Sequence, residues 1–256
     1  MLVLLRLAKM PYLIIRDIFR LRNIDTLVYS VGKVGSRSFC DNKKTFHVHT
    51  LSGTSNKYFS VSYDSKLSVS EFLSEYFYWN IIGYFIKLKI KKRSINKIIV
   101  PIREPIIRNI SSYFQTTKVK KNNFCHVEFY HDVNPLVINN WFENEIFRIV
   151  DVKIEDFDVN KNNPFFSFNV SGIDIFIIKL ERLDECKDIL MQSIGIDAIS
   201  HVNKRGDQEY AGSYSEFKDG LELSEDYLNF IYTNTYLRFF YSSNEIEVFK
   251  KYWLKK

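Results

Sequence analysis

The chain has few cysteines and few of the residues that mark linkers. Three cysteines occur among 256 residues, widely spaced and without a C-x-x-C pair, which argues against a disulfide framework and favours a reducing compartment, by default the cytoplasm. The five prolines and nine glycines form no Pro/Gly/Ser-rich stretch, and there is no internal repeat. With 46% hydrophobic residues, the chain is expected to form one α/β domain over residues 25–256.

Long apolar runs are also missing. Residues 1–24 are apolar and basic, but Arg6, Lys9 and Arg16 interrupt them, and no run reaches the roughly 18 residues that a membrane span requires. No small-residue cleavage site follows, so a secretory signal is not expected. Pro11 is expected to break the helical register. We predict an amphipathic helix packed on the domain; the alternative is an interfacial helix, peripheral at the inner face of the membrane.

Acidic residues are outnumbered by basic ones. The net charge is +6, carried partly by clusters at 87–93 and 118–121. Such an excess favours an anionic partner such as a nucleotide, an acidic glycan, lipid head groups or nucleic acid. A solvated basic face without a partner explains each cluster equally well.

Short β-branched runs alternate with helical patterns. Strands are expected at 25–31, 45–51, 96–102 and 173–180. Helices are expected after Ser36, over 69–93, from Pro105, over 134–150 and 184–193, and from 207 to the end. The apolar stripe of 69–93 is typical of a core helix. This order predicts a three-layer α/β/α fold with a central, mainly parallel sheet and additional C-terminal helices.

Two stretches about seventy residues apart, 30–38 and 98–113, are the most informative part of the chain. Each follows an expected strand and opens a helix-like segment, so each would present backbone N–H groups and cationic side chains to an anion. In a parallel sheet both would lie beyond the carboxyl ends of the strands. Two anion sites on one sheet indicate a doubly phosphorylated nucleotide.

The first stretch is not a Walker A sequence, because Lys33 precedes Gly35 instead of following the second glycine. A magnesium-dependent nucleoside triphosphatase is therefore disfavoured, although a kinase on a P-loop-like sheet remains an alternative. Ser36 and Ser38 could cap the following helix. Taken alone, the glycine loop could also be a plain structural turn.

Together the stretches resemble the sulfotransferases that use 3′-phosphoadenosine-5′-phosphosulfate (PAPS). Lys33-Val-Gly-Ser-Arg-Ser38 matches their 5′-phosphosulfate loop, and Arg103, Pro105 and Ser111 match the spacing of their 3′-phosphate motif, in which a Tyr such as Tyr113 is also common. The segment 177–183 resembles a third family motif, with Glu181 matching while Leu180 and Arg182 depart from it. The resemblance implies a P-loop-like fold and needs no metal.

Within this family, the chain resembles most specifically a bacterial branch associated with capsular polysaccharide synthesis. The resemblance extends from about Val28 to the C-terminus and is weakest over 122–169. It rests on His47-Val-His49 after the second strand and on a C-terminal pattern of Asn203-Lys204, Tyr210, Tyr214, Phe217, Phe240-Tyr-Ser242 and Trp253. It implies a saccharide acceptor and PAPS as the sulfuryl donor, with no nucleic acid partner.

The resemblance also implies roles for individual residues. Lys33 would meet the leaving oxygen, and His49 would be the general base, with Glu71 and Glu75 as distant candidates. The residues expected to bind the nucleotide are Lys33, Val34, Gly35, Ser36, Arg37 and Ser38 in the first stretch, Arg103 and Ser111 in the second, and Lys204, Arg205 and Gly206 in a cationic lid.

Purely structural roles remain as alternatives for several of these residues. Arg103 could form an ion pair with Glu104 or a neighbouring carboxylate, His49 could be a structural strand residue, and 204–206 could be a solvated turn. The segment 125–131 contains Cys and His but lacks a recognised zinc-ligand spacing, so no metal is predicted. A basic, non-enzymatic module that binds membrane or nucleic acid is the alternative of a different class.

Overall fold

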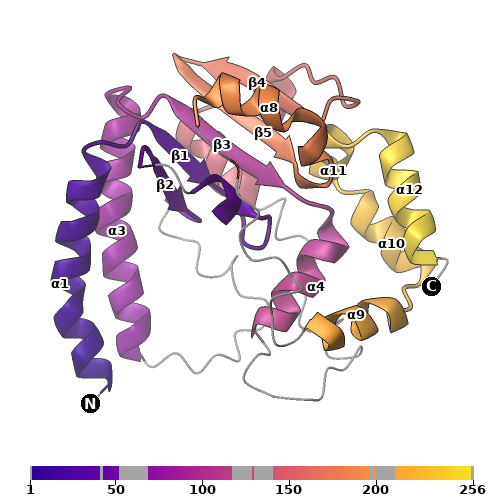
Figure 1. The fold of residues 1–256 in the computed structure, drawn as a ribbon, viewed down its shortest axis with the longest axis horizontal. Helices are drawn as coiled ribbons and strands as arrows, with labels where there is room; N and C mark the ends of the chain where they lie inside the picture. Colours follow the sequence, from indigo (N-terminus) through magenta and orange to yellow (C-terminus); the bar gives the residue numbers. More distant parts are fainter. Residues whose placement is uncertain are drawn as a thin grey trace.

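The centre of the molecule is a five-stranded sheet (Figure 1). The structure is a computed structural model, and it describes residues 2–40, 43–51, 69–116, 129, 141–196, 199 and 211–254. The strands are β1 (Thr26–Tyr29), β2 (Thr45–Val48), β3 (Lys97–Ile102), β4 (Phe165–Val170) and β5 (Ile173–Lys179), and their order across the sheet is β2-β1-β3-β5-β4.

Four of the strands are parallel and β4 alone is antiparallel to its neighbour β5. The four parallel strands are those that the sequence predicts, and the expectation of a mainly parallel sheet is confirmed. β4 was not predicted. It forms a hairpin with β5 through Ser171 and Gly172, which have positive φ angles of 51° and 81°. Two positive φ angles are typical of the tight turns that join antiparallel strands.

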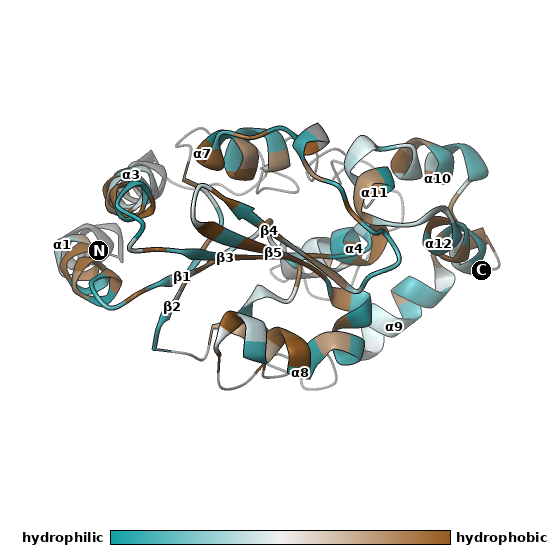
Figure 2. Cartoon of the chain, turned by 90° about the horizontal axis from the view of Figure 1, so that it is seen from above, coloured by the Kyte–Doolittle hydropathy of each residue, from teal (hydrophilic) through white to brown (hydrophobic). Residues whose placement is uncertain are grey.

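Apolar side chains cover both faces of the sheet. Val28, Ile99 and Phe176 pack under α8 (Leu183–Ile194), whereas Leu27, Ile98 and Ile175 belong to the larger cluster on the other face. That cluster includes side chains from α3 (Val69–Lys91), α4 (Pro105–Thr116), the π-helix η3 (Phe142–Phe147) and the short helix α7 (Arg148–Val150) that continues it. Figure 2 shows α8 and α7 on opposite sides of the sheet. The fold is thus α/β, with helices on both faces.

Helix α1 (Leu2–Leu21) lies beside α3, which confirms that the N-terminal helix packs on the rest of the chain (Figure 1). The Lys89 ammonium group of α3 donates to the carbonyl oxygens of Leu21, at 2.5 Å, and of Ile24, at 2.8 Å, which ties α3 to the end of α1 and to the turn that follows it. The expected break at Pro11 is wrong, because α1 runs through it. Packing on α3 compensates for the one backbone hydrogen bond that proline removes.

The apolar stripe of α3 is only partly core. Ile82 and Ile86 are fully buried, while Phe77 is 58% and Tyr84 60% exposed. The prediction that the whole stripe packs in the core is therefore wrong for the exposed side chains of α3, such as Phe77. Among the described residues, no helix combines the length and apolarity that a bilayer crossing needs.

The C-terminal part is helical, as predicted. Its helices are α9 (Ala211–Gly220), α10 (Glu225–Tyr232), α11 (Thr235–Phe240) and α12 (Ser243–Leu254). Ser224 caps α10 by accepting from the amide of Tyr227, and Asn234 caps α11 by accepting from the amide of Tyr236. Short 3-10 turns η4 (Ile154–Asp156) and η5 (Leu180–Arg182) lie before β4 and after β5. Of the predicted helix 134–150, residues 134–140 lie outside the described residues.

Candidate functional site

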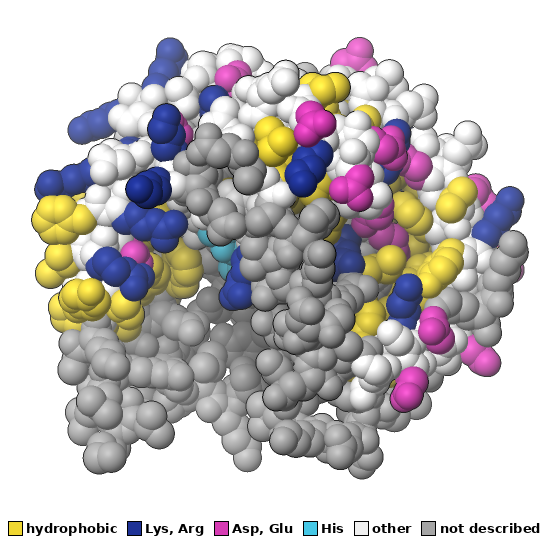
Figure 3. All heavy atoms as spheres, viewed as in Figure 1, with side chains coloured by type: hydrophobic (Ala, Val, Ile, Leu, Met, Phe, Trp, Pro, Cys, Tyr) yellow, Lys and Arg dark blue, Asp and Glu magenta, His cyan; other side chains and the backbone are white. Residues whose placement is uncertain are grey.

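The site lies where the sheet order reverses. β1 has β2 on one side and β3 on the other, so the connections after β1 and β2 lead to opposite sides of β1. Crevices at the carboxyl ends of such strands are where open α/β sheets bind ligands. The first stretch follows β1. His47 lies on β2 and His49 just after it, and the second stretch begins on β3 and continues into α4. Figure 3 shows a histidine and a Lys or Arg side chain at the base of a hollow in this surface.

The loop after β1 is held in an unusual backbone conformation. Lys33 and Gly35 have positive φ angles of 73° and 65°. A Cβ atom on Gly35 would lie 2.9 Å from Cδ2 of Leu180 at the end of β5, so only glycine fits there without movement. A non-glycine residue such as Lys33 in this conformation is strained, and strained residues cluster at functional sites.

The helix expected after Ser36 is a single 3-10 turn, η1 (Ser36–Phe39). The prediction of a couple of helical turns is wrong, and so is the prediction of a serine cap, because the cap residue is Gly35 and no side chain bonds there. A four-residue turn has little dipole. In the described part of the chain the hydroxyls of Ser36 and Ser38 bond to no other group, so both remain available as donors.

Arg103 joins the two stretches. Its Nη1 donates to the carbonyl oxygen of Lys33 and to the hydroxyl of Ser111, both at 3.3 Å. The Ser111 hydroxyl in turn donates to the carbonyl oxygen of Ile107 at 2.9 Å. The two stretches expected to hold opposite ends of a nucleotide are therefore joined by hydrogen bonds.

Arg108 is a site residue that the sequence reasoning missed. It is 1% exposed, and it donates from Nε to the carbonyl oxygen of Gly32 at 3.1 Å and from Nη1 to Asn109 Oδ1 at 2.9 Å. Among the described residues no carboxylate pairs with it. Burial lowers the pKa of Arg108 to about 10. A buried cation without a counter-ion is costly, and an anion beside it removes that cost.

The side chain of Lys33 lies in the field of the neighbouring cations. Burial, followed by repulsion from Arg108 and Arg37, lowers the pKa of Lys33 to about 8. These charges lie close enough together to disfavour one another, which is the electrostatic signature of a site prepared for an anion.

The beginning of α4 does not offer its amides to a ligand. The buried carboxylate of Glu104 accepts from the amides of Ile106 at 3.0 Å and Ile107 at 2.7 Å and from the hydroxyl of Tyr232. The expectation that this helix N-terminus faces an anion is therefore wrong, and an anion there would be held by side chains. The alternative ion pair between Arg103 and Glu104 is not formed.

Glu181, part of the third motif, ties the site to the C-terminal helices. Its carboxylate accepts from the amide of Glu104 at 2.6 Å and from the hydroxyl of Tyr241 at 3.0 Å. Farther along, Phe217 stacks on Tyr113 of α4 with 5.4 Å between ring centroids. The C-terminal aromatic residues thus support α4 and the end of β5.

The two histidines lie side by side on β2 and just after it. Their ring centroids are 4.3 Å apart. Nδ1 of His49 is 2.7 Å from the carbonyl oxygen of Ser30, and Nε2 of His47 is 3.3 Å from the hydroxyl of Ser30. Burial lowers the pKa of both, that of His47 to about 3. Both rings are therefore neutral at pH 7.

Glu145 is a second residue that the sequence reasoning missed. It is fully buried on η3 and accepts from Thr50 Oγ1 at 2.8 Å, from the amide of Leu51 at 2.7 Å and from the hydroxyl of Tyr29. Trp141 Nε1 donates to the carbonyl oxygen of His49 at 2.8 Å. These contacts fix the chain just after the predicted base.

Some predicted site residues lie outside the described residues. They are the lid residues Lys204, Arg205 and Gly206. The segment 125–131, for which no metal was predicted, also lies outside the described residues except at Phe129. Glu71 and Glu75 lie on α3, in a part whose side chains are not described. Val34 is fully buried and packs in the core, and Arg37 is exposed beside His47. Within the described ranges, no three His, Cys, Asp or Glu side chains gather as a metal would require.

No family model, no curated protein and no solved structure matches this chain.

Proposed function

We propose that the protein is a PAPS-dependent sulfotransferase with a P-loop-like sheet, which transfers a sulfuryl group to a saccharide hydroxyl. The observation that carries this proposal is the position of Arg103, between the carbonyl of Lys33 and the hydroxyl of Ser111. These hydrogen bonds link a phosphosulfate-type loop to a 3′-phosphate-type motif, as binding of one nucleotide by both would require. The buried Arg108 adds a positive charge that an anion would balance.

The two ends of the nucleotide would be held by different groups. Arg103 and Ser111 would bind the 3′-phosphate, the guanidinium through its planar fork and the serine through its hydroxyl. The hydroxyls of Ser36 and Ser38 and the ammonium of Lys33 would bind the 5′ end. When bound, the nucleotide would supply the SO3 group and leave as 3′,5′-adenosine bisphosphate.

His49 is suited to take the acceptor's proton. A carbonyl oxygen can only accept, so Nδ1 of His49 carries the ring proton toward Ser30, and the lone pair is on Nε2. Nε2 would accept the proton of the acceptor hydroxyl as the new S–O bond forms. Lys33 would stabilise the phosphate oxygen that takes the electron pair of the S–O bond that breaks.

The acceptor class and the cellular setting rest on the resemblance to bacterial capsule-associated sulfotransferases. We propose synthesis of a surface polysaccharide in the cytoplasm, with peripheral contact of α1 and α3 with an anionic membrane leaflet. Tyr12, Ile15 and Phe19 on α1 are 67%, 54% and 55% exposed, and the exposed Arg22 lies over the ring of Phe19. Exposed apolar side chains flanked by cations are typical of membrane-surface helices.

Thermal shift distinguishes the proposal from its alternatives, because a ligand raises the melting temperature by mass action. We expect 3′,5′-adenosine bisphosphate to stabilise the protein and ATP with Mg²⁺ to have a smaller effect. Stabilisation by ATP alone would favour a kinase, and indifference to both nucleotides would favour a non-enzymatic module. Either result contradicts the proposal.

Turnover with labelled donor and a glycan panel tests the transfer itself. Lys33→Ala and Arg103→Ala are expected to abolish sulfate transfer while circular dichroism shows an intact fold. Normal turnover in both variants would refute the assignment.

A further inference from the structure

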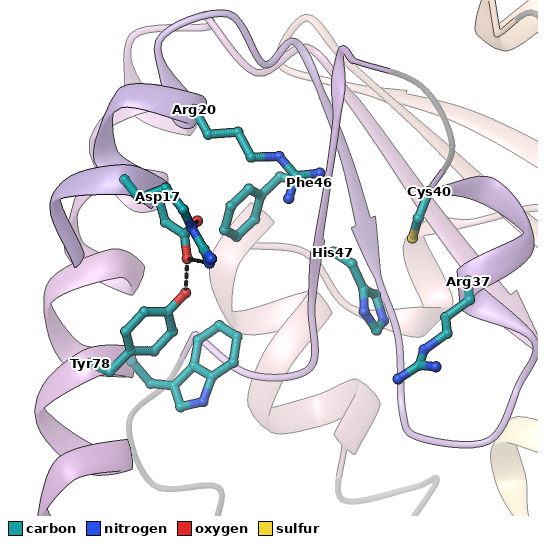
Figure 4. Close-up of a pocket in the computed structure, with 9 residues that line it drawn as sticks. Asp17, Arg20, Arg37, Cys40, Phe46, His47 and Tyr78 are labelled. Carbon is teal, nitrogen blue, oxygen red and sulfur yellow. Dashed lines mark hydrogen bonds and ion pairs between the residues drawn. The ribbon is translucent and has the colours of Figure 1, made fainter. Parts of the chain in front are cut away.

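A cavity of about 420 Å³ lies between α1, α3, β2 and η1, next to the proposed nucleotide crevice (Figure 4). A volume in this range is typical of small-molecule sites. The cavity shares Arg37 with the surroundings of Lys33, and the ring of His47, which lines the cavity, is 4.3 Å from that of His49. A molecule in this cavity would therefore lie against His47, whose ring contacts that of the proposed base.

One part of the cavity wall is aromatic. Phe46, Tyr78 and Trp79 line it, and the rings of Tyr78 and Trp79 meet edge to face with 5.0 Å between their centroids. Flat aromatic rings beside polar groups suit a ligand that has both an apolar face and hydroxyl groups, which describes a sugar ring.

The charged residues of the cavity are mostly basic. Asp17 is its one carboxylate among the lining residues, and that carboxylate is already occupied. It accepts from Nε and Nη2 of Arg16 at 2.8 and 2.9 Å and from the hydroxyl of Tyr78. Asp17 thus forms its ion pair with Arg16, and Arg20 also helps to lower the pKa of Asp17. Among the lining residues, three arginines face this one carboxylate, so the cavity has an excess of positive charge.

The arginines of the cavity other than Arg16 are Arg20 and Arg37. In Figure 4 they reach in from opposite sides, with Phe46 and His47 between them. Arg20 is fixed by donating to the carbonyl oxygen of Thr45 at 3.2 Å and by lying over the Phe46 ring at 5.3 Å. Among the described residues, neither has a carboxylate partner. Two guanidinium groups across an aromatic floor favour a ligand that carries a negative charge.

We propose that this cavity binds the acceptor and that the acceptor is an acidic saccharide, whose carboxylate or phosphate lies between Arg20 and Arg37. The proposal rests on the proposed function for the role of acceptor. It defines a substrate class, because a neutral sugar would supply no negative charge to Arg20 and Arg37.

Isothermal titration of the full chain with matched oligosaccharides tests this. The probes are a glucuronate-containing oligosaccharide, its carboxyl-reduced neutral counterpart and a phosphorylated oligosaccharide of similar length. We expect the neutral form to bind at least tenfold more weakly than the glucuronate form. The phosphorylated probe shows which anion the arginines prefer, and binding of either acidic probe above the neutral one supports the proposal. Equal binding of all three, or no binding of any, overturns it.

Variants separate the charge from the stacking surface. Arg20→Gln is expected to lower the affinity for the acidic oligosaccharides about tenfold and to leave the affinity for the neutral one unchanged. Trp79→Leu is expected to lower the affinity for both kinds. Arg22→Gln is the matched control, since Arg22 follows α1 but does not line the cavity. If Arg22→Gln lowers the affinity for the acidic oligosaccharide as much as Arg20→Gln does, the assignment of the cavity is overturned.

A parallel titration with 3′,5′-adenosine bisphosphate keeps the two proposals apart. Arg20→Gln and Trp79→Leu are expected to bind this nucleotide as the unmodified protein does. If the unmodified protein binds the acidic saccharide but not the nucleotide, the proposed function fails and the cavity remains a saccharide site. If the nucleotide binds and no saccharide does, the cavity assignment fails.

Discussion

Nδ1 of His49 lies 2.7 Å from the carbonyl oxygen of Ser30, and this contact fixes the proton on Nδ1. The Ser30 backbone, just after β1, thus sets the tautomer of His49, just after β2. The lone pair of the neutral ring is therefore on Nε2, and the lowered pKa of His49 keeps the ring neutral at pH 7.

His49→Asn is expected to lower kcat by about 10²–10⁴, the usual contribution of a general base. The Asn amide can still donate to the Ser30 carbonyl but cannot take a proton, so nucleotide affinity should change little. Steady-state kinetics and titration with 3′,5′-adenosine bisphosphate measure the two effects. An unchanged kcat would move the base to another residue.

Nucleotide affinity should fall as pH rises above 8. In the free protein the pKa of Lys33 is about 8, and an anion favours the charged form, so the bound pKa is higher. Below pH 8 Lys33 is charged in both states and contributes no pH dependence. Above pH 8, Lys33 takes up a proton when the nucleotide binds, so the nucleotide affinity falls by up to about tenfold per pH unit.

Lys33→Arg is the control for this pH dependence, because arginine stays charged throughout. Titration from pH 7 to pH 10 should give a flat profile for the variant. The same slope in both proteins would show that another group takes up the proton.

Gly35→Ala is expected to destabilise the fold by about 1–3 kcal/mol, the cost of a non-glycine residue in a sparsely populated conformation. The new Cβ would also approach Leu180 at 2.9 Å. Gly32→Ala is the matched control in the same loop, since nothing lies within 4 Å of its Cβ position, and it should stay within about 0.5 kcal/mol. Urea unfolding measures both, and equal stabilities would contradict the described loop.

Vesicle sedimentation tests the outer face of α1 and α3. The protein should bind vesicles that contain phosphatidylglycerol more than vesicles of phosphatidylcholine alone, and added salt should weaken the binding. Phe19→Ser and Tyr84→Ser remove exposed side chains and should reduce binding while leaving the melting temperature nearly unchanged. Binding that is indifferent to both substitutions would exclude this surface as the contact.

The parallel strands could be predicted because each is a nearly continuous apolar, β-branched run, as strands buried on both faces are. β4 was missed because it is half exposed, with Ser167 and Asn169 outside. The Ser171-Gly172 pair that follows it was an available signal, since a two-residue turn of this kind indicates a hairpin.

The sequence motifs predicted Lys33, His49, Arg103 and Ser111 as site residues, and hydrogen bonds from Arg103 join it to Lys33 and Ser111. The motifs could not show the burial of Arg108 or Glu145, because burial depends on how α4 and η3 are rotated against the strands. The helix after Ser36 was overestimated for a similar reason. Phe39 must reach the cluster under α8, and the chain turns toward it after four residues.

Arg103 and Arg108 anchor the loop after β1 to α4 through the carbonyl oxygens of Lys33 and Gly32. A loop tethered in this way has little chain entropy to lose when a ligand arrives. Association should consequently be fast and limited by diffusion and salt screening, with differences in affinity among ligands appearing in their residence times.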